Sequence, residues 1–587
     1  MTLTVDAKLA DLTVMVAGQG GDGSLTVINH LSRVLGHRGF QMYTSRDVAS
    51  RIKGGHAAGV MRASIAQRRN VGDHVDLLVA FDAEAIEKGG PRVSPHGVVI
   101  FDGSLGPPPA GYLPDSVEVL SIPFGRLAVR DLRRDLFKNS VAYGVACRVF
   151  RLEDDEIEAN LREGLSRFPD SIIEANVGAL HVGLAYADDA GLIDRTWQLD
   201  QQEKSPHLLM TGNEALALGF VAAGGRFYTG YPITPATDVL DFLQRWIEKF
   251  GGIALQAEDE LASINMALGA SMAGVRSMTA SSGPGIALMQ EAVGQAGAAE
   301  IPLVIVDCQR SGPSTGMPTK PEQSDIGMLT TGGNGDFPRV VLVPSDPTDA
   351  FEIGVTATNV AQELQGPVYV ALDQAVAQNS ATVALFDIAA VEVKAGGQIG
   401  AAQIDQLNEV RRYLINDSGI SSWAPPGTAG GMSLVTGNEH DEWGHVSTEP
   451  GNRVRMMDKR ARKVDQVLGD LPGALLGGDP DAAIGMLGVG LESGPLLEAA
   501  ERLSDHGNPV SVLIPRTLWP VPKETLDFIN AHDLTYVVEH NSSGQLASVL
   551  RSVGAPADRI ASLLRYDGLP FTAGDLVERF LAAEAGQ

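Results

Sequence analysis

Short apolar runs alternate with helix-like segments along most of this chain, and this alternation limits its fold more than any other feature. Each run has the length of a strand and is followed by a turn and a segment with helical periodicity. The runs are Leu12–Ala17, Val75–Phe81, Gly97–Phe101, Val117–Ile122, Arg226–Tyr228, Leu303–Asp307, Val340–Val343, Val368–Leu372, Ala483–Gly488, Val510–Ile514 and Thr535–Val538. This strand–helix–strand rhythm predicts largely parallel sheets covered by helices. We therefore expect an α/β protein.

The length of the chain and its polar interruptions predict several domains. At roughly 150 residues per domain, 587 residues correspond to three or four domains. A polar stretch at Arg195–Pro206 reads as a linker, and the Pro425–Gly427 break lies in a region without clear periodicity. The expected segments are residues 1–195, residues 206–380, a connector at 381–471 that includes a basic helix, and residues 472–587.

The charge and the cysteine content exclude several classes of protein. The chain has 45 Lys and Arg against 72 Asp and Glu, a net charge of −27 that repels nucleic-acid phosphates. Two cysteines, Cys147 and Cys308, are too few for a disulfide framework or an all-cysteine zinc or iron–sulfur site. The N-terminus lacks a basic and apolar leader, and no run approaches the roughly 20 apolar residues of a membrane helix. We expect a cytoplasmic protein with neither nucleic acid nor membrane as a partner.

A glycine-rich turn at Gly18–Gly23 follows the first strand and satisfies the GxGxxG pattern. Its backbone N–H groups at a helix N-terminus favour an anionic phosphate. The acid expected to bind a ribose is poorly placed, because Asp47 follows Arg46 in a polar stretch and does not end a clean strand. The Gly-Asp-Gly of the turn also begins the diphosphate–magnesium signature of thiamine enzymes, but no Asn follows at Asp47–Ser50, so we expect no metal site. A nicotinamide site and a packing turn both stay open.

Two further motifs carry groups for binding an anion and for transferring a proton. In the loop Tyr231-Pro232-Ile233-Thr234-Pro235, two prolines stiffen the chain directly after a strand and present the hydroxyl of Thr234. A plain strand-end turn is the other interpretation of this loop. In the motif Glu258-Asp259-Glu260, the helix dipole accounts for the first two acids. Glu260 adjoins the apolar face of the following helix, so we expect it to point inward as a proton-handling group.

The loop Gln309–Asp325 follows a predicted strand and holds two cations, Arg310 and Lys320, among glycines and prolines. In a chain this acidic, cations at the carboxyl edge of a sheet are candidates for binding a carboxylate or a phosphate. A surface salt bridge of Lys320 with Glu322 or Asp325 stays open as the other interpretation.

Taken in order, these motifs resemble the alpha subunits of the 2-oxoacid:ferredoxin oxidoreductases, in the form with a gamma domain fused at the N-terminus. The motifs are GNEA at Gly212–Ala215, GYPITP at Gly230–Pro235, EDE at Glu258–Glu260, SSGPG at Ser281–Gly285, QRSGPSTGMPTK at Gln309–Lys320 and VEHNSSGQL at Val538–Leu546, with Gly18–Gly23 and Arg51–Gly55 for the gamma domain. The resemblance spans nearly the whole chain. It implies three α/β domains: a gamma-type domain, a thiamine-diphosphate pyrimidine-binding domain and a transketolase-C-terminal-like domain.

The resemblance implies an enzyme that decarboxylates a 2-oxoacid oxidatively, passes electrons to ferredoxin and transfers the acyl group to coenzyme A. The GPSTGMPTK loop is most similar to the branch that converts 2-oxoglutarate to succinyl-CoA. Because the second domain resembles only the pyrimidine half of the thiamine diphosphate site, a partner beta subunit is implied to carry the diphosphate half, Mg²⁺ and an iron–sulfur cluster. The expected assembly is an (alpha-beta)2 heterotetramer, inactive without beta.

The same resemblance assigns roles to residues by position. Glu260 matches the glutamate that bonds the aminopyrimidine ring nitrogen, and Thr234 matches a residue that binds the substrate carboxylate. The expected cofactor-binding residues are Tyr231, Pro232, Ile233, Thr234 and Glu260. Lys320 stands where many relatives have Arg, and it offers a point charge in place of a bidentate fork. Arg310 is the alternative cation for the carboxylate.

Three alternatives stay open from the sequence alone. In the first alternative, the substrate is pyruvate or another 2-oxoacid. It stays open because the residues that contact the substrate side chain are not identifiable from the sequence. The second is a nicotinamide-dependent dehydrogenase built on Gly18–Gly23, which binding of NAD without thiamine diphosphate would identify. The third is a non-catalytic electron-transfer or scaffold subunit.

Overall fold

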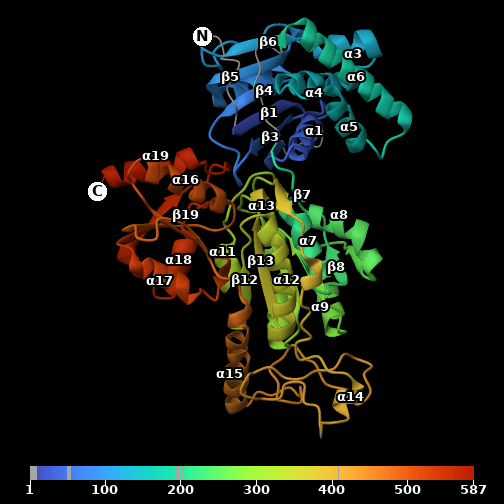
Figure 1. The fold of residues 1–587 in the computed structure, drawn as a ribbon. Coiled ribbons are helices and arrows are strands. Elements are labelled where there is room, and N and C mark those ends of the chain that lie inside the picture. The colour runs from blue at the N-terminus through green and yellow to red at the C-terminus, as the bar shows by residue number, and fades with distance from the viewer. Residues whose placement is uncertain are drawn as a thin grey trace. The chain divides into compact units, whose positions relative to one another are not determined.

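The protein contains helices and strands arranged in three sheets, which confirms the α/β prediction (Figure 1). The computed structural model describes residues 10–48, 54–192, 197, 199, 202–407 and 409–586, so Arg51, Ile52, Lys53 and positions 195, 196, 198, 200 and 201 of the expected linker at 195–206 lie outside the described residues. The chain forms two compact units. Unit 1 comprises Met1–Leu209, Asn379–Leu385 and Thr572–Asp575, and unit 2 comprises Met210–Gln378, Phe386–Phe571 and Leu576–Gln587.

The first sheet has eight strands in the order β6-β5-β4-β1-β3-β2-β14-β7. They are β1 (Asp11–Gln19), β2 (Gln41–Val48), β3 (His56–Ser64), β4 (Val75–Ala80), β5 (Val93–Asp102), β6 (Glu118–Ile122), β7 (His207–Thr211) and β14 (Ser380–Ala384). Strands β1, β4, β5 and β6 run parallel as expected, but β3 pairs antiparallel with both β1 and β2. The expectation that Asp47 lies outside a clean strand is wrong, because Asp47 pairs with Ala58 in β2. β2 is mostly half-buried and keeps polar side chains that hide the strand pattern.

Six helices accompany this sheet: α1 (Ser24–His37), α2 (Ala83–Gly89), α3 (Phe124–Leu132), α4 (Lys138–Val149), α5 (Asp154–Gly164) and α6 (Asp170–Asp189). The glycine-rich turn leads into α1 through Gly23, whose φ of 85° suits glycine. The carboxylate of Asp22 accepts a hydrogen bond from the backbone N–H of Gln19 at 2.9 Å and forms an ion pair with Lys138 at 2.9 Å. An acid of the chain itself therefore accepts a hydrogen bond from one backbone amide of this turn.

The larger sheet of unit 2 has seven strands in the order β18-β12-β13-β11-β10-β8-β9. They are β8 (Phe227–Gly230), β9 (Ile253–Gln256), β10 (Ser277–Ser281), β11 (Leu303–Gln309), β12 (Val340–Leu342), β13 (Pro367–Asp373) and β18 (Thr517–Trp519). All pairs are parallel except β12 with β18. The associated helices are α7 (Gly212–Ala222), α8 (Thr237–Trp246), α9 (Glu260–Met272), α10 (Gly283–Ala298), α11 (Ile326–Thr331), α12 (Pro347–Leu364) and α13 (Gln374–Gln378). Strands β11 and β13 are buried along their whole length, as central parallel strands covered by helices should be.

The smaller sheet of unit 2 has five strands in the order β15-β17-β16-β19-β20. They are β15 (Leu475–Gly478), β16 (Ile484–Leu487), β17 (Ser511–Ile514), β19 (Leu534–Glu539) and β20 (Ile560–Leu564), accompanied by α16 (Ser493–Asp505), α17 (Lys523–Ala531), α18 (Gln545–Ser552) and α19 (Ala573–Ala585). None of the helices in the described ranges is both long and apolar enough to cross a bilayer.

The connector between the two sheets of unit 2 is mostly irregular, with the short α14 (Ala401–Ile404) and the expected basic helix α15 (Pro450–Val467) (Figure 1). The buried carboxylate of Glu300, between α10 and β11, connects α15 to the part of unit 2 that holds the larger sheet. The carboxylate of Glu300 forms ion pairs with Nζ of Lys459 at 2.6 Å and with Nζ of Lys463 at 2.5 Å. All three side chains have no exposed surface. Buried ion pairs of this kind fix one arrangement of the elements that they join, because separating them would leave an unpaired buried charge.

Candidate functional site

Four of the sequence motifs come together at one edge of the larger sheet of unit 2. Strands β11, β10, β8 and β9 are neighbours and run parallel, so the loops that follow them leave from the same edge. Ligands of open α/β sheets bind at this carboxyl edge. The loops are Gly230–Pro235, Ala257–Asp259, Ser281–Gly285 and Gln309–Asp325. We call these four loops and the side chains that they carry the candidate site.

Glu260 is the buried acid of the candidate site. It is the first residue of α9 and is 8% exposed, whereas Glu258 and Asp259 are exposed. Asp259 caps the helix, since its carboxylate accepts a hydrogen bond from the backbone N–H of Ala262 at 2.7 Å. The inward position expected of Glu260 and the capping position of Asp259 therefore both appear in the structure.

Glu260 packs directly against Gly285, and we call Glu260, Gly285 and the two serines Ser281 and Ser282 the cradle. A Cβ on Gly285 would lie 2.9 Å from Oε1 of Glu260 and 2.0 Å from Oγ of Ser281. The hydroxyl groups of Ser281 and Ser282 are buried without a hydrogen-bond partner in the described part of the chain. A buried carboxyl group and two unpaired hydroxyl groups together suit a ligand that carries ring nitrogens or amino groups.

The GYPITP loop, which follows β8, is held by Arg310, which follows β11, two strands away in the sheet. Nη1 of Arg310 donates a hydrogen bond to the carbonyl oxygen of Thr234 at 2.7 Å, and the Arg310 side chain is buried. Burial lowers the pKa of Arg310, and the nearby Asp325 opposes this effect. Nδ2 of Asn213, in the first turn of α7, donates a second hydrogen bond to this loop, to the carbonyl oxygen of Pro235 at 2.9 Å. The structure thus brings Arg310 and Thr234, which belong to different motifs, into direct contact.

Two acids that the sequence did not single out as functional lie near Arg310: Asp307 is buried and Asp325 is half-buried. Asp307 lies two residues before the end of β11 and Asp325 precedes α11, and their carboxyl groups are in hydrogen-bonding contact. In the described residues, neither oxygen of Asp307 has another donor. Burial raises the pKa of Asp325 to about 6, Glu322 adds to this rise, and burial together with Asp325 raises the pKa of Asp307 well above its ordinary value. Because carboxylates only accept hydrogen bonds, a direct contact between the two carboxyl groups requires that one of them carries a proton.

The loop that carries Lys320 folds back onto its own beginning. The backbone N–H of Ser311 donates to the carbonyl oxygen of Lys320 at 3.0 Å, and the hydroxyl of Ser311 donates to the carboxylate of Glu322. The backbone of Lys320 therefore lies beside that of Arg310 and Ser311, although ten positions separate the two cations in the sequence. Lys320 itself is half-buried.

The smaller sheet of unit 2 holds this loop in place. The backbone N–H of Gln323 donates to the carbonyl oxygen of His540 at 2.7 Å. The side chain of Gln545 donates to the carbonyl oxygen of Ser324 at 2.7 Å and accepts from the N–H of Gly327 at 2.8 Å. Residues of the VEHNSSGQL motif thus position the loop with the two cations.

Comparison with known proteins identifies the family. Residues 13–186 match the model described as pyruvate ferredoxin/flavodoxin oxidoreductase, and residues 219–459 match that of pyruvate flavodoxin/ferredoxin oxidoreductase, thiamine-diphosphate-binding. The chain is 30% identical to 2-oxoacid:ferredoxin oxidoreductase 2, subunit alpha, of Aeropyrum pernix, over 98% of each chain. The chain belongs to the 2-oxoacid:ferredoxin oxidoreductase alpha subunits.

Two further proteins support this assignment. The 2-oxoacid:ferredoxin oxidoreductase alpha subunit described here is 30% identical to the 2-oxoglutarate oxidoreductase subunit KorA of Mycobacterium tuberculosis, over 99% of this chain and 92% of that one. It superimposes with a TM-score of 0.91 and 33% identity on the 2-oxoglutarate:ferredoxin oxidoreductase of Magnetococcus marinus, covering 98% of this chain and all of that one. That structure was solved with 2-oxoglutarate, coenzyme A and succinyl-CoA bound. The family resemblance and the oxidoreductase class predicted from the sequence are confirmed.

Proposed function

We propose that this chain is the alpha subunit of a 2-oxoglutarate:ferredoxin oxidoreductase. The reaction converts 2-oxoglutarate and coenzyme A into succinyl-CoA and carbon dioxide, and an electron pair passes to two ferredoxins. The observation that carries the choice of substrate is the pair of cations, Arg310 and Lys320, whose backbones lie together in the loop after β11. 2-Oxoglutarate has two carboxylates and pyruvate has one, so a second cation favours the dicarboxylate. The names of the M. tuberculosis and M. marinus relatives support the same substrate.

The cradle fits the pyrimidine half of thiamine diphosphate. Its carboxyl group and its unpaired serine hydroxyls suit an aminopyrimidine ring, and the loop Tyr231–Thr234 would form an adjoining wall. When bound, thiamine diphosphate supplies the carbon nucleophile for attack on a 2-oxo carbonyl. Glu260 would hold a proton at a carboxyl oxygen for the ring nitrogen, and its burial would keep water from competing for that proton.

The remaining residues of the candidate site would orient the substrate. The hydroxyl of Thr234 and the guanidinium of Arg310 would hold one carboxylate, and the Lys320 ammonium would hold the other. The Asp307–Asp325 pair supports this role of Arg310. Because the two carboxyl groups share a proton, they oppose the charge of Arg310 with one negative charge in place of two.

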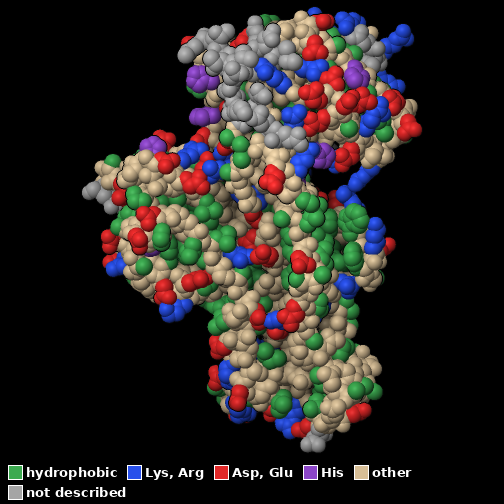
Figure 2. Space-filling view, viewed as in Figure 1, with side chains coloured by type: hydrophobic (Ala, Val, Ile, Leu, Met, Phe, Trp, Pro, Cys, Tyr) green, Lys and Arg blue, Asp and Glu red, His purple; other side chains and the backbone are tan. Residues whose placement is uncertain are grey.

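An exposed apolar face next to the candidate site would bind the partner subunit. It is formed by the edge strand β9 with the neighbouring α8 and α9, and Figure 2 shows hydrophobic side chains gathered near α7, α8 and β8. Its large exposed side chains are Trp246, Phe250, Ile253, Leu255, Leu261 and Met266. Exposed apolar patches on this scale mark interfaces. We assign this face to a beta subunit that carries the diphosphate half of the cofactor site, Mg²⁺ and an iron–sulfur cluster, in an (alpha-beta)2 assembly.

The proposal is tested by producing the chain together with its beta partner and measuring coenzyme A-dependent reduction of ferredoxin. We expect a kcat/KM for 2-oxoglutarate well above that for pyruvate. The variant Lys320→Ala should lower kcat/KM for 2-oxoglutarate by roughly ten- to a hundredfold, since a charge-assisted hydrogen bond contributes ~1.5–3 kcal/mol. Lys320→Arg should retain most activity.

Each failure of this experiment has a separate meaning. Equal use of pyruvate would contradict 2-oxoglutarate as the substrate, and an unchanged kcat/KM in Lys320→Ala would remove Lys320 from substrate binding. No ferredoxin reduction with any 2-oxoacid, together with NAD binding at Gly18–Gly23, would instead favour the dehydrogenase alternative.

A further inference from the structure

A cavity of about 350 Å³ lies between the connector and the larger sheet of unit 2. It opens at the end of the sheet opposite the candidate site, because its walls include Met272 at the end of α9 and Ile301 just before β11. Since α9 begins at Glu260 and rises ~1.5 Å per residue, the cavity is roughly 18 Å from that acid. It is therefore distinct from the pyrimidine cradle.

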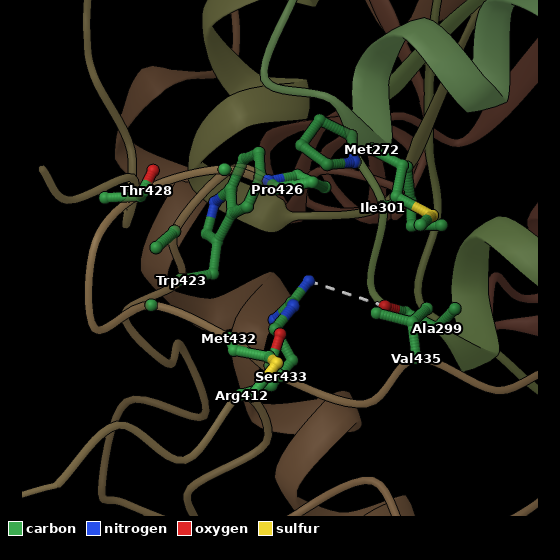
Figure 3. A pocket seen from close by; sticks show the side chains of 14 residues that line it. Met272, Ala299, Ile301, Arg412, Trp423, Pro426, Thr428, Met432, Ser433 and Val435 are labelled. Carbon is green, nitrogen blue, oxygen red and sulfur yellow. Dashed lines mark hydrogen bonds between the residues drawn. The ribbon is translucent and has the colours of Figure 1, made fainter.

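The walls of the cavity are largely apolar. Figure 3 shows Trp423, Pro426 and Met432 of the connector facing Ile301 and Met272 across the space, with Arg412 between them. Trp423 is buried, whereas Met432 is 95% exposed and extends the apolar wall outward. Such a combination of apolar walls and one charged group is typical of small-molecule sites.

A cluster with an excess of positive charge lies behind this cavity. Arg412 donates through Nη1 to Oε1 of Gln365 at 3.1 Å and through Nη2 to the carbonyl oxygens of Ala299, at 3.4 Å, and Glu300. In the described part of the chain, Arg412, Lys459 and Lys463 share a single carboxylate, that of Glu300.

This excess charge is buried. The other acceptors of these cations are neutral carbonyl groups, such as the backbone carbonyl oxygen of Gln365, to which Nζ of Lys463 donates at 3.2 Å. Burial lowers the pKa of Lys463 to about 7, an effect that Glu300 opposes and that Lys459 and Arg412 reinforce. Uncompensated buried charge is unfavourable, so an anion in the cavity would be stabilised.

We propose that the cavity binds a compact apolar carboxylate, with its charged end toward Arg412 and its hydrocarbon body against Trp423 and Ile301. The size follows from the volume. A dry cavity of ~150 Å³ holds benzene, so about 350 Å³ accommodates an acid of roughly eight carbons. The charge follows from the cation excess behind Arg412, which favours an anion over a neutral molecule of equal size.

The test compares octanoate with the neutral octanol as probes of the full-length chain by titration calorimetry. We expect octanoate to bind at submillimolar concentration and about tenfold more tightly than octanol, as one charge-assisted contact would give. Octanoate binding at pH 7 should also take up protons, because an anion near Arg412 would raise the pKa of Lys463. Titration in buffers of different ionisation enthalpy measures that uptake.

Two variants separate the charge from the space. Arg412→Met should reduce octanoate binding to the level of octanol while octanol binding persists, which also shows that the fold is retained. Ser433→Phe fills the cavity from its wall and should abolish binding of both probes. Gln406→Phe places the same ring on an exposed connector position outside the cavity and should change neither.

Several results would overturn the proposal. They are equal affinity of octanoate and octanol in the unaltered chain, octanoate binding that survives Ser433→Phe, and loss of octanoate binding once the beta partner is bound. The last result would show that the cavity is part of a subunit interface. The experiment measures binding alone, so its outcome does not depend on the reaction proposed above.

Discussion

Three consecutive acids illustrate how the position of a residue on an element decides its chemistry. Glu258 is exposed, Asp259 caps α9, and only Glu260 is buried, where it forms part of the cradle. The sequence predicted this difference, because the apolar face of the following helix fixes which acid points inward. The Asp307–Asp325 pair could not be predicted in the same way. Its two members meet only because the loop after β11 returns to the strand end, and no spacing rule describes that return.

The first prediction concerns Glu260. Glu260→Gln should lower turnover by ~10²–10⁴-fold, because a glutamine cannot hold or release the proton that acid–base catalysis requires. Thermal unfolding of the variant should stay close to that of the unaltered protein, since the two side chains have nearly the same shape. Coenzyme A-dependent ferredoxin reduction by the alpha–beta complex measures the effect.

Glu258→Gln is the matched control for this prediction. It changes an exposed acid two residues away and should leave turnover within a factor of two or so, as expected for surface substitutions. Turnover of Glu260→Gln within a few-fold of the unaltered enzyme would remove Glu260 from the reaction.

The second prediction concerns the pH dependence of the Asp307–Asp325 pair. The folded protein raises the pKa of Asp325 from 3.8 to about 6, so its contribution to stability is present below pH 4 and is lost as the pH rises toward 6. Asp325→Asn removes this loss. Relative to the unaltered chain, the variant should therefore gain stability between pH 4 and 7, by on the order of 1–3 kcal/mol.

Denaturant unfolding of the chain and the variant at pH 4.5, 6 and 7.5 measures this difference. Asp405→Asn, at an exposed position of the connector, should show no such trend. A free-energy difference between Asp325→Asn and the unaltered chain that is constant with pH would show that the pair does not share a proton.

At the scale of elements, strands with a strong apolar pattern were predictable and those with a polar or minimal pattern were not. β11 and β13 are buried throughout and read as strands from sequence alone. β2 is mostly half-buried and polar, so its pattern resembles a loop. β18 has three residues, and it joins the larger sheet from a part of the chain assigned to another domain. Long-range pairing of this kind depends on tertiary packing, which local propensity does not encode.

The third prediction concerns the link between α18 and the loop of the two cations. Gln545→Ala removes two hydrogen bonds, to Ser324 and to Gly327, and should destabilise this contact by ~1–3 kcal/mol. The loop should then be less well ordered, so the KM for 2-oxoglutarate should rise more than kcat falls. Hydrogen exchange of the Gly327 amide should accelerate.

The comparison for this prediction is Gln406→Ala, which alters an exposed glutamine of the connector. Unchanged exchange at Gly327 in Gln545→Ala would mean that the loop keeps its conformation without α18. An unchanged KM with faster exchange would separate the conformation of the loop from substrate binding.

At the scale of the whole molecule, the proposed half-site for thiamine diphosphate beside an exposed apolar face predicts a protein that works only in an assembly. The fourth prediction follows from this. The chain alone should show no iron–sulfur absorbance and no tight binding of thiamine diphosphate. With the beta partner it should form an (alpha-beta)2 heterotetramer, because closed two-fold assemblies are common. Ile253→Asp should weaken this assembly, since it places a charge on the apolar face.

Leu476→Asp provides the control, because Leu476 is an exposed apolar residue of another edge strand, β15. Analytical ultracentrifugation of the mixed subunits distinguishes the two variants. Stoichiometric thiamine diphosphate on the isolated chain, or full assembly of Ile253→Asp, would contradict the shared site or the placement of the interface.

The pairing of β18 with β12 limits how this polypeptide can be divided into modules. Val341 and Leu342 of β12 pair with Trp519 and Thr517, so a segment that follows the connector completes the larger sheet. A truncated chain ending before residue 472 would leave β12, whose side chains are all buried, with an unpaired row of backbone N–H and C=O groups. Such an edge is a template for aggregation. If unit 2 were divided into two polypeptides, both would therefore have to be expressed in the same cell. A chimaera that takes its last segment from a relative would need a β18 that pairs with the β12 of this chain.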